Sequence, residues 1–302
     1  MKKYGFRLLC IIVILGLLAW EYIPGPRKST LDASTLGVDE VTPLALELVY
    51  EGEKPEGVSS VQGFAITDDY FVVAGRPRGS AAEGGESNNR LIIIDRQSYA
   101  NVTGDFFEAD ETMELGHANG MTYDSVRGEL VVVGMRDVNG DYRNAARINA
   151  EDFQLLETLA LPCYASGIAY DDDSGCYFVR SGTVLTSISG TMNQTRDEYY
   201  IGTLFTGQDI GFYHGKAYLV NWINKDNLHD AWKVGLDLNE NIVYQFDIAT
   251  GRLCAFIVSE PYQEMESIDF VDGEAYVLIN GTGLMQKKYF IYKALFDPHG
   301  IE

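Results

Sequence analysis

Asn119-Gly120-Met121-Thr122-Tyr123 is one copy of a short pattern that recurs five times along this chain. Each copy has a polar residue, a small residue, an apolar residue, a second small residue, and an aromatic or aliphatic one. A polar turn and a strand-like segment follow every copy. The other four copies are Gln62–Ile66, Ser166–Tyr170, Gln208–Phe212 and Glu266–Phe270. Repetition at this scale indicates an architecture built from similar structural units.

The spacing of the copies points to a β-propeller. Successive copies lie 42 to 58 residues apart, and a four-stranded blade takes about 40 to 50 residues with insertions in its loops. Alternation of apolar and polar residues within each unit has the period of a strand. We therefore predict an all-β, five-bladed β-propeller, with an irregular stack of hairpins or a two-sheet sandwich as the alternative. The expected second strands are Tyr70–Ala74, Glu129–Gly134, Cys176–Arg180, Lys216–Asn221 and Glu274–Ile279.

Two further strands are expected in most units. Third strands are predicted at Arg90–Asp95, Ala145–Asn149, Thr183–Ser189, Ile242–Ile248 and Lys288–Leu295. Outer strands are predicted at Phe106–Glu108, Phe153–Leu161, Tyr199–Leu204 and Arg252–Val258. The fifth unit has no outer strand of its own. We expect Leu46–Tyr50 to pair with the last third strand and close the ring, which removes two exposed sheet edges.

The first 28 residues form a separate segment. Lys2, Lys3 and Arg7 precede an apolar run from Leu8 to Trp20, the composition of a hydrophobic signal peptide or signal anchor helix. We expect residues 29–43 to be a tether and residues 44–302 to be the propeller. The propeller would then be extracytoplasmic, either anchored to the cell membrane by its N-terminus or secreted after cleavage.

The net charge of the chain bears on its binding partners, and its cysteine count bears on disulfide bonds. The chain carries 44 Asp and Glu against 23 Lys and Arg, a formal net charge of −21. Such a surface repels nucleic acid and anionic polymers, so no nucleic-acid partner is expected. Cys163, Cys176 and Cys254 follow the N-terminal segment, and an odd number is not a disulfide framework. Whether Cys163 and Cys176 pair stays open at this stage.

The repeat also predicts a functional site. The first strand of each blade lines the channel of a propeller, where small residues such as Gly120 let the backbones converge. The polar residues of the pattern would then ring one mouth of the channel, and His117 would lie on the same face as Asn119, two residues later. The residues expected to bind a ligand at this mouth are Gln62, His117, Asn119, Ser166, Gln208, Asp209 and Glu266.

Several functions suit such a mouth. The preferred hypothesis is a membrane-tethered binding module for a glycan, a wall component or a protein ligand at the cell envelope. The alternative is a hydrolase of the glycosidase or metal-dependent lactonase kind, in which Asp209 and Glu266 act as acid and base. The oxygen ligands at this mouth would also suit a hard cation such as calcium; no cofactor is predicted. The polar side chains can also simply bond to one another and to channel water.

An insertion at residues 221–241 adds aromatic side chains to this picture. It carries Trp222 and Trp232. An aromatic loop on a propeller rim suits stacking against sugar rings, with packing over the fourth blade as the alternative.

One nonapeptide resembles a known family. Gly116-His117-Ala118-Asn119-Gly120-Met121-Thr122-Tyr123-Asp124 is similar to the G-H-x-N-[DG]-M-T-Y-[DN] signature of the five-bladed propellers related to the TagC teichoic-acid-locus protein and to phage receptor-binding propellers. The resemblance implies a cell-envelope propeller that recognises a wall polymer or a glycan. It implies no catalytic set, and the net charge argues against direct binding of anionic teichoic acid.

Overall fold

The computed structural model describes residues 33–77, 88–109, 111–135, 140–203, 206–224, 226, 228–236, 238, 240–258 and 260–295. The predicted signal or anchor segment, residues 1–28, lies outside them. Among the described residues, no helix combines the length and the apolar composition that a membrane span requires. The helices of the described residues are few and short: α2 (Ala33–Leu36), α3 (Leu228–Val234), and the 3-10 turns η1 (Thr103–Asp105) and η2 (Gly283–Met285).

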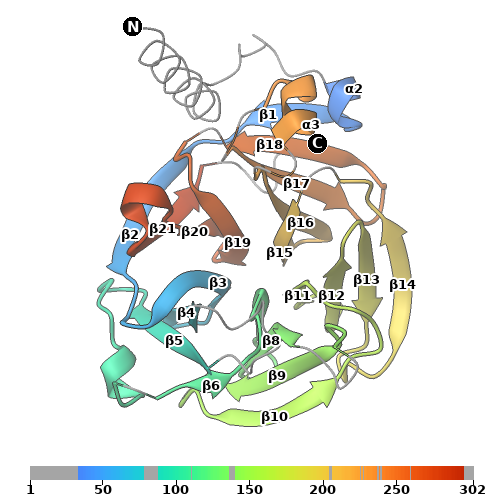
Figure 1. Ribbon diagram of the computed structural model, residues 1–302. Coiled ribbons are helices and arrows are strands. Elements are labelled where there is room, and N and C mark those ends of the chain that lie inside the picture. The colour runs from blue at the N-terminus through green and yellow to red at the C-terminus, as the bar shows by residue number, and fades with distance from the viewer. Residues whose placement is uncertain are drawn as a thin grey trace, which may run out of the picture.

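Five sheets stand in a ring around a central axis (Figure 1), which confirms the predicted five-bladed propeller. The first blade holds β3 (Val58–Ile66), β4 (Tyr70–Pro77), β5 (Asn88–Asp95) and β6 (Met113–Glu114). The second holds β7 (Gly120–Asp124), β8 (Glu129–Met135), β9 (Asn144–Asn149) and β10 (Leu155–Ala160). The third holds β11 (Gly167–Asp171), β12 (Cys176–Ser181), β13 (Val184–Ile188) and β14 (Thr195–Tyr200).

The fourth and fifth blades take strands from both ends of the described chain. The fourth holds β15 (Thr206–Tyr213), β16 (Lys216–Trp222), β17 (Asn241–Asp247) and β18 (Leu253–Val258), with β1 (Glu40–Pro43) parallel to β18 at its edge. The fifth holds β19 (Glu264–Val271), β20 (Glu274–Asn280), β21 (Lys288–Ala294) and β2 (Leu46–Glu53). Antiparallel pairing of β2 with β21, from Leu46 opposite Ala294 to Glu53 opposite Lys288, closes the ring as predicted.

The differences from the predicted strands lie at the outer edge. The end of the expected tether, residues 29–43, contains β1 and is part of the fourth blade. In the first blade the outer strand is Met113–Glu114 rather than Phe106–Glu108, and in the third blade it is Thr195–Tyr200 rather than Tyr199–Leu204. Five of the six residues of β14 are exposed, so this strand has no apolar face whose alternation could locate it.

The core lies between neighbouring blades. Val131 of β8 and Ile168 of β11, for example, share one buried cluster with Tyr177 and Val179 of β12. At the axis, each first strand contacts the first strands of both neighbouring blades, so the ring is closed on the inside as well. Cys163, Cys176 and Cys254 are free thiols, which answers the pairing question in the negative.

The second residue of the repeat is glycine in three copies, Gly63, Gly120 and Gly167, whereas the last two copies depart from this pattern with Asp209 and Ser267. A Cβ added to Gly120 would lie 2.5 Å from Asp209 Oδ1, and one added to Gly167 would lie 3.0 Å from the same atom. The Asp209 side chain therefore occupies the space that these glycines leave. Ser267, the other departure, donates its hydroxyl to Asp209 Oδ2 at 2.8 Å.

Candidate functional site

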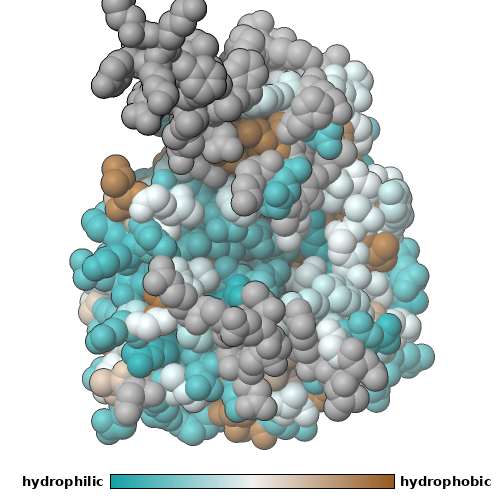
Figure 2. Space-filling model, viewed as in Figure 1, coloured by the Kyte–Doolittle hydropathy of each residue, from teal (hydrophilic) through white to brown (hydrophobic). Residues whose placement is uncertain are grey.

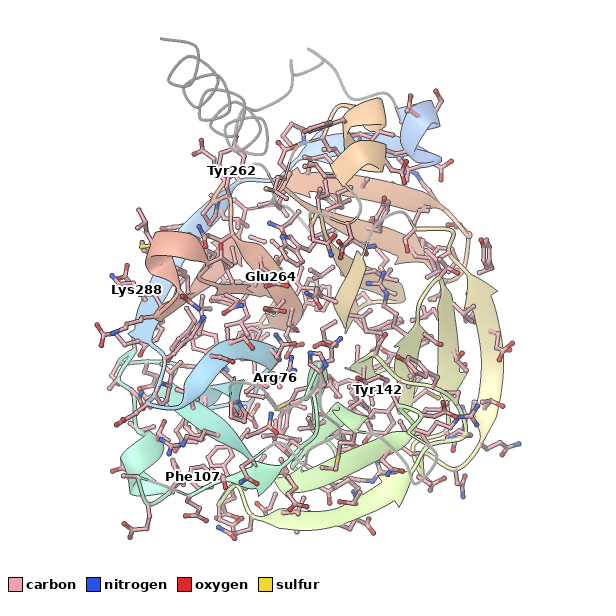
Figure 3. All side chains as sticks on the ribbon, in the orientation of Figure 1. Arg76, Phe107, Tyr142, Tyr262, Glu264 and Lys288 are labelled. Carbon is pink, nitrogen blue, oxygen red and sulfur yellow. The ribbon has the colours of Figure 1, made fainter. Side chains whose placement is uncertain are left out.

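A cavity of about 480 Å³ lies at one mouth of the central channel, and all five blades contribute to it. Figure 2 shows hydrophilic residues gathered around the centre of this face. Arg76, Tyr142 and Glu264 lie around the middle of the ring, whereas Phe107 and Lys288 lie at its periphery (Figure 3). The lining residues are Ser60, Gln62, Arg76, His117, Asn119, Gly134, Tyr142, Tyr164, Ser166, Gly207, Gln208, Trp222 and Glu264.

Local irregularities of the first strands direct the polar side chains of the repeat. In β3, β15 and β19 the pairing register shifts at the repeat, between Val61 and Phe64, between Gly207 and Ile210, and between Met265 and Ser267. Such β-bulges re-aim side chains and are common beside functional sites. In the second and third blades the polar residue immediately precedes the first strand. The repeat thus marks the point where the first strand of each blade either departs from regular pairing or begins.

Five of the seven predicted site residues line the cavity: Gln62, His117, Asn119, Ser166 and Gln208. The other two do not. Asp209 and Glu266 are 0% and 1% exposed and are absent from the cavity lining. Their predicted place at the mouth is therefore wrong, because the bulges turn both side chains inward. The part that the other five play in binding stays a prediction.

Asp209 is enclosed by hydrogen-bond donors from three other blades. Its Oδ2 accepts from the backbone N–H of Met121 at 3.2 Å and its Oδ1 from that of Ile168 at 3.0 Å, in addition to the Ser267 hydroxyl. Burial raises the pKa of the Asp209 carboxyl to about 8. A carboxyl capped in this way ties blades together at the axis and cannot reach a substrate in the cavity.

Glu264 takes the place at the mouth that was expected for Glu266. Glu264 Oε1 accepts from Gln208 Nε2 at 2.9 Å, and Oε2 accepts from Asn280 Nδ2 at 3.3 Å. Glu266 lies deeper, where its Oε1 accepts from Gln62 Nε2 at 3.2 Å. Burial raises the pKa of Glu264, and burial together with the neighbouring Glu264 raises the pKa of Glu266 well above its usual range.

Sequence reasoning missed Glu264 although the signal for it was present. His117 was found because it stands two residues before the polar residue of its repeat. The same offset gives Ser60, Tyr164 and Glu264, and all three line the cavity. Arg76 and Trp222, by contrast, come from the ends of the second strands β4 and β16. Trp222 belongs to the insertion that was singled out for its aromatic residues.

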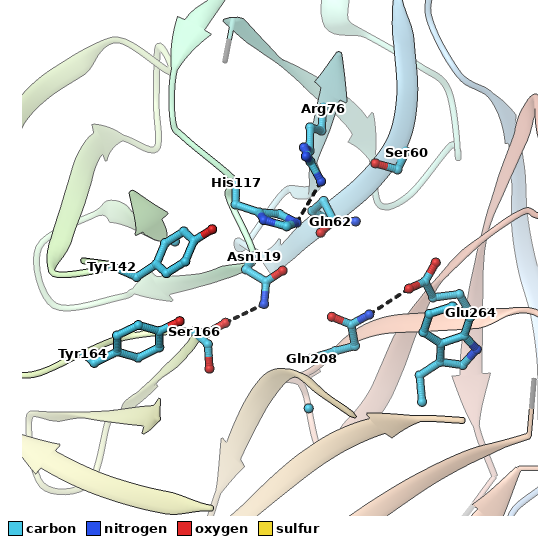
Figure 4. A pocket seen from close by; sticks show the side chains of 13 residues that line it. Ser60, Gln62, Arg76, His117, Asn119, Tyr142, Tyr164, Ser166, Gln208 and Glu264 are labelled. Carbon is cyan, nitrogen blue, oxygen red and sulfur yellow. Dashed lines mark hydrogen bonds between the residues drawn. The ribbon is translucent and has the colours of Figure 1, made fainter. Parts of the chain in front are cut away.

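One side of the cavity is aromatic. The rings of Tyr142 and Tyr164 lie 5.5 Å apart edge to face, and those of His117 and Tyr142 lie 6.5 Å apart. Figure 4 shows these rings beside the polar groups. Arg76 Nη1 lies 2.9 Å from His117 Nε2, and Asn119 Nδ2 donates to the Ser166 carbonyl at 2.9 Å. The site combines planar rings with amide, carboxylate and guanidinium groups.

A lysine lies behind the acidic pair. Lys54 Nζ donates to the backbone carbonyls of Gln286 at 2.9 Å, Gly281 at 3.2 Å and Ser59 at 3.3 Å. Burial lowers the pKa of Lys54, and the charges of Glu266 and Glu264 partly offset this effect. Within the part of the chain that the structure describes, no group of three or more His, Cys, Asp or Glu side chains is placed to hold a metal ion.

Comparison with known proteins supports the β-propeller fold but does not assign the chain to a family. No family model matches the sequence, so the family suggested by the nonapeptide is not supported, and no curated protein matches it either. A solved GH43_1 enzyme from Xanthomonas citri has a TM-score of 0.53 at 9% identity, over 84% of this chain and 94% of that one. At such an identity the likeness shows the fold alone.

Two further solved structures are more weakly similar. Hydrazine synthase from Kuenenia stuttgartiensis has a TM-score of 0.42 at 11% identity over 76% of this chain, which spans 58% of that chain. A luciferin-regenerating enzyme has a TM-score of 0.46 at 10% identity, over 83% of this chain and 95% of that one. Likenesses at this level carry no argument about the function of this chain.

Proposed function

We propose that this protein is a binding module of the cell envelope whose channel-mouth cavity takes a sugar unit of a glycan. The observation that carries the proposal is the composition of the cavity wall: aromatic rings stand beside amide and carboxylate groups contributed by different blades. Sugars present flat C–H faces together with hydroxyl edges, and such walls match both. The cavity volume of about 480 Å³ falls within the range of small-ligand pockets, about 300 to 1,000 Å³.

The hydrogen-bonding groups in the cavity are already oriented. Gln208 is held by Glu264 and Asn119 by the Ser166 carbonyl, which fixes these side chains before any ligand arrives. A site that is ordered in advance loses less conformational entropy on binding. The N-terminal hydrophobic segment supports the envelope location, because its basic start and apolar run are those of an export signal or membrane anchor.

Titration calorimetry of the purified propeller with wall-derived oligosaccharides tests the proposal. We expect Tyr142→Ala and Gln208→Ala each to weaken binding about tenfold, which corresponds to about 1.4 kcal/mol. Tyr200→Ala is the matched control, because Tyr200 lies on the outer strand β14 and is 78% exposed. If no oligosaccharide binds, or if the control weakens binding as much as the cavity variants, the proposal fails.

One observation favours a hydrolase as the second candidate. Glu264 lines the cavity and burial raises its pKa, which is the direction of shift that a carboxyl needs to act as a general acid. The two carboxyls first considered for this role, Asp209 and Glu266, are both enclosed. Release of nitrophenol from chromogenic glycosides measures this activity. It should be abolished by Glu264→Gln and kept by Glu47→Gln, a change on exposed strand surface.

A further inference from the structure

Arg76 is unlike the four described arginines that form ion pairs with carboxylates. Among the described residues it forms no ion pair with a carboxylate, whereas ion pairs are formed by Arg96, Arg127, Arg147 and Arg252. Its guanidinium lines the cavity, and Nη1 lies 2.9 Å from His117 Nε2. Nε is buried and has no hydrogen-bond partner. A buried donor left without a partner costs about 1 to 3 kcal/mol, so its presence beside a cavity calls for an explanation.

The contact with His117 leaves one edge of the guanidinium without a hydrogen-bond partner. Arginine is always protonated, so Nη1 donates and the Nε2 of His117 accepts. No described residue accepts a hydrogen bond from Nε or Nη2. These two atoms form the side-on edge of the guanidinium, whose donors match the two oxygens of a carboxylate. His117 therefore acts as a positioning residue that holds Nη1, at the opposite end of the guanidinium.

Two cations and two acids lie at or beside the cavity. Arg76 and Lys54 are the cations, and Glu264 and Glu266 are the acids. Burial raises the pKa of both acids, and the neighbouring Glu264 raises that of Glu266 further, so ionisation of the two together is disfavoured. The Arg76 guanidinium therefore gives this mouth a cation beside acids whose ionisation is disfavoured, although the whole chain carries −21.

Resting on the function proposed above, we infer that the ligand is an acidic sugar whose carboxylate pairs with the free edge of Arg76. The carboxylate would neutralise the charge of Arg76 and accept from Nη2, and a turn of the guanidinium toward the cavity would bring the buried, unpaired Nε within its reach. Sugar hydroxyls would then face Gln208 and Glu264 across the cavity. Because the rest of the molecule is strongly acidic, a ligand with a single negative charge is accepted and a polyanion is repelled.

Matched pairs of sugars test this inference in the full exported chain. Glucuronic acid differs from glucose, galacturonic acid from galactose, and N-acetylmuramic acid from N-acetylglucosamine by a carboxylate-bearing group. Calorimetry should show at least one acid binding about tenfold or more tightly than its neutral partner, as expected for a charge-assisted hydrogen-bonded pair. Arg76→Gln should remove the preference for the acidic sugar. Arg76→Lys should keep part of it, because lysine retains the positive charge but not the two parallel N–H donors of the guanidinium.

The control is Arg252→Gln, which removes an arginine that pairs with Glu40 at the outer edge of the fourth blade. It should leave the preference intact. The melting temperature of each variant without ligand shows whether it is folded, and Arg76→Lys serves if Arg76→Gln does not fold. Equal binding of acidic and neutral sugars overturns the inference and leaves the binding proposal standing. Tighter binding of glucose 6-phosphate than of glucuronic acid overturns the assignment of a carboxylate. No binding by any sugar ends both proposals.

Discussion

Gly120 shows how a single residue type sets the geometry of the channel. A Cβ at this position would lie 2.5 Å from Asp209 Oδ1, 2.7 Å from the Gly167 Cα and 2.9 Å from the Ile168 nitrogen. Two of these atoms belong to the backbone of the next blade and cannot move without moving the strand. The glycine of the repeat is therefore a packing requirement where first strands converge.

We predict that Gly120→Ala destabilises the protein by about 1 to 3 kcal/mol, the usual cost of overpacking a tight interior. Gly104→Ala is the control, because nothing lies within 4 Å of a Cβ at that position and its φ is not in the left-handed region. Urea unfolding of both variants measures the difference. Equal free energies of unfolding for the two variants would contradict the packing argument.

Asp209 predicts a pH dependence of stability. Its pKa is near 3.8 ordinarily and is raised by burial to about 8 in the folded protein. Between these values the folded state holds a proton that the unfolded state has released. The stabilisation is therefore fully present below about pH 4 and is lost as pH rises toward 8, with a slope of at most about 1.4 kcal/mol per pH unit.

Asp209→Asn removes this titration, so its free energy of unfolding should fall less steeply between pH 5 and pH 8 than that of the unmodified protein. The slope is the readout, since the amide also changes the hydrogen bonds at the axis and lowers stability at every pH. Asp69→Asn, on an exposed turn, should keep the original slope. Parallel curves for the protein and Asp209→Asn would rule out a protonated Asp209.

At the scale of elements, β2 closes the ring of blades by pairing with β21. It supplies the outer strand of the fifth blade from a position before the first blade in the chain. Lys54, directly after it, binds carbonyls of the loop that precedes β21. The two ends of the propeller are thus joined by backbone pairing and by a side chain.

A chain beginning at Val58 lacks β1 and β2, exposes the edge of β21 and should lose solubility or cooperative unfolding. A chain beginning at Leu44 lacks, of the described elements, only α2 and β1 and should still unfold in one transition. Thermal unfolding followed by circular dichroism compares them. If the shorter chain unfolds at the same temperature and as sharply as the longer one, closure by β2 is not needed for stability.

At the scale of the whole molecule, the acidic propeller and the N-terminal hydrophobic segment predict an exported domain. A phosphatase that is active only outside the cytoplasm, fused after Glu302, should be active in cells. The same fusion to a chain beginning at Ser29 should be inactive, because it lacks the export segment. Activity of both fusions, or of neither, would contradict the predicted topology.

The sequence by itself determined the architecture of the molecule. The five repeats, the second and third strands and the closure by Leu46–Tyr50 follow from a period-two pattern that buried strands impose on their own residues. Exposed outer strands such as β14 carry no such pattern, and for this reason their positions were predicted wrongly or only roughly. The polar ring at one channel mouth was also visible, since five of its seven predicted residues line the cavity.

Tertiary structure alone decided which acids line the cavity. Glu264 and Glu266 stand two residues apart in one strand, and a bulge between Met265 and Ser267 decides that the first lines the cavity and the second is enclosed. Arg76 reaches the site from a second strand, and Tyr142 from a loop of another blade. Such neighbours are set by the register of pairing and by the packing of blades, which join residues far apart in the sequence and leave no local pattern to read.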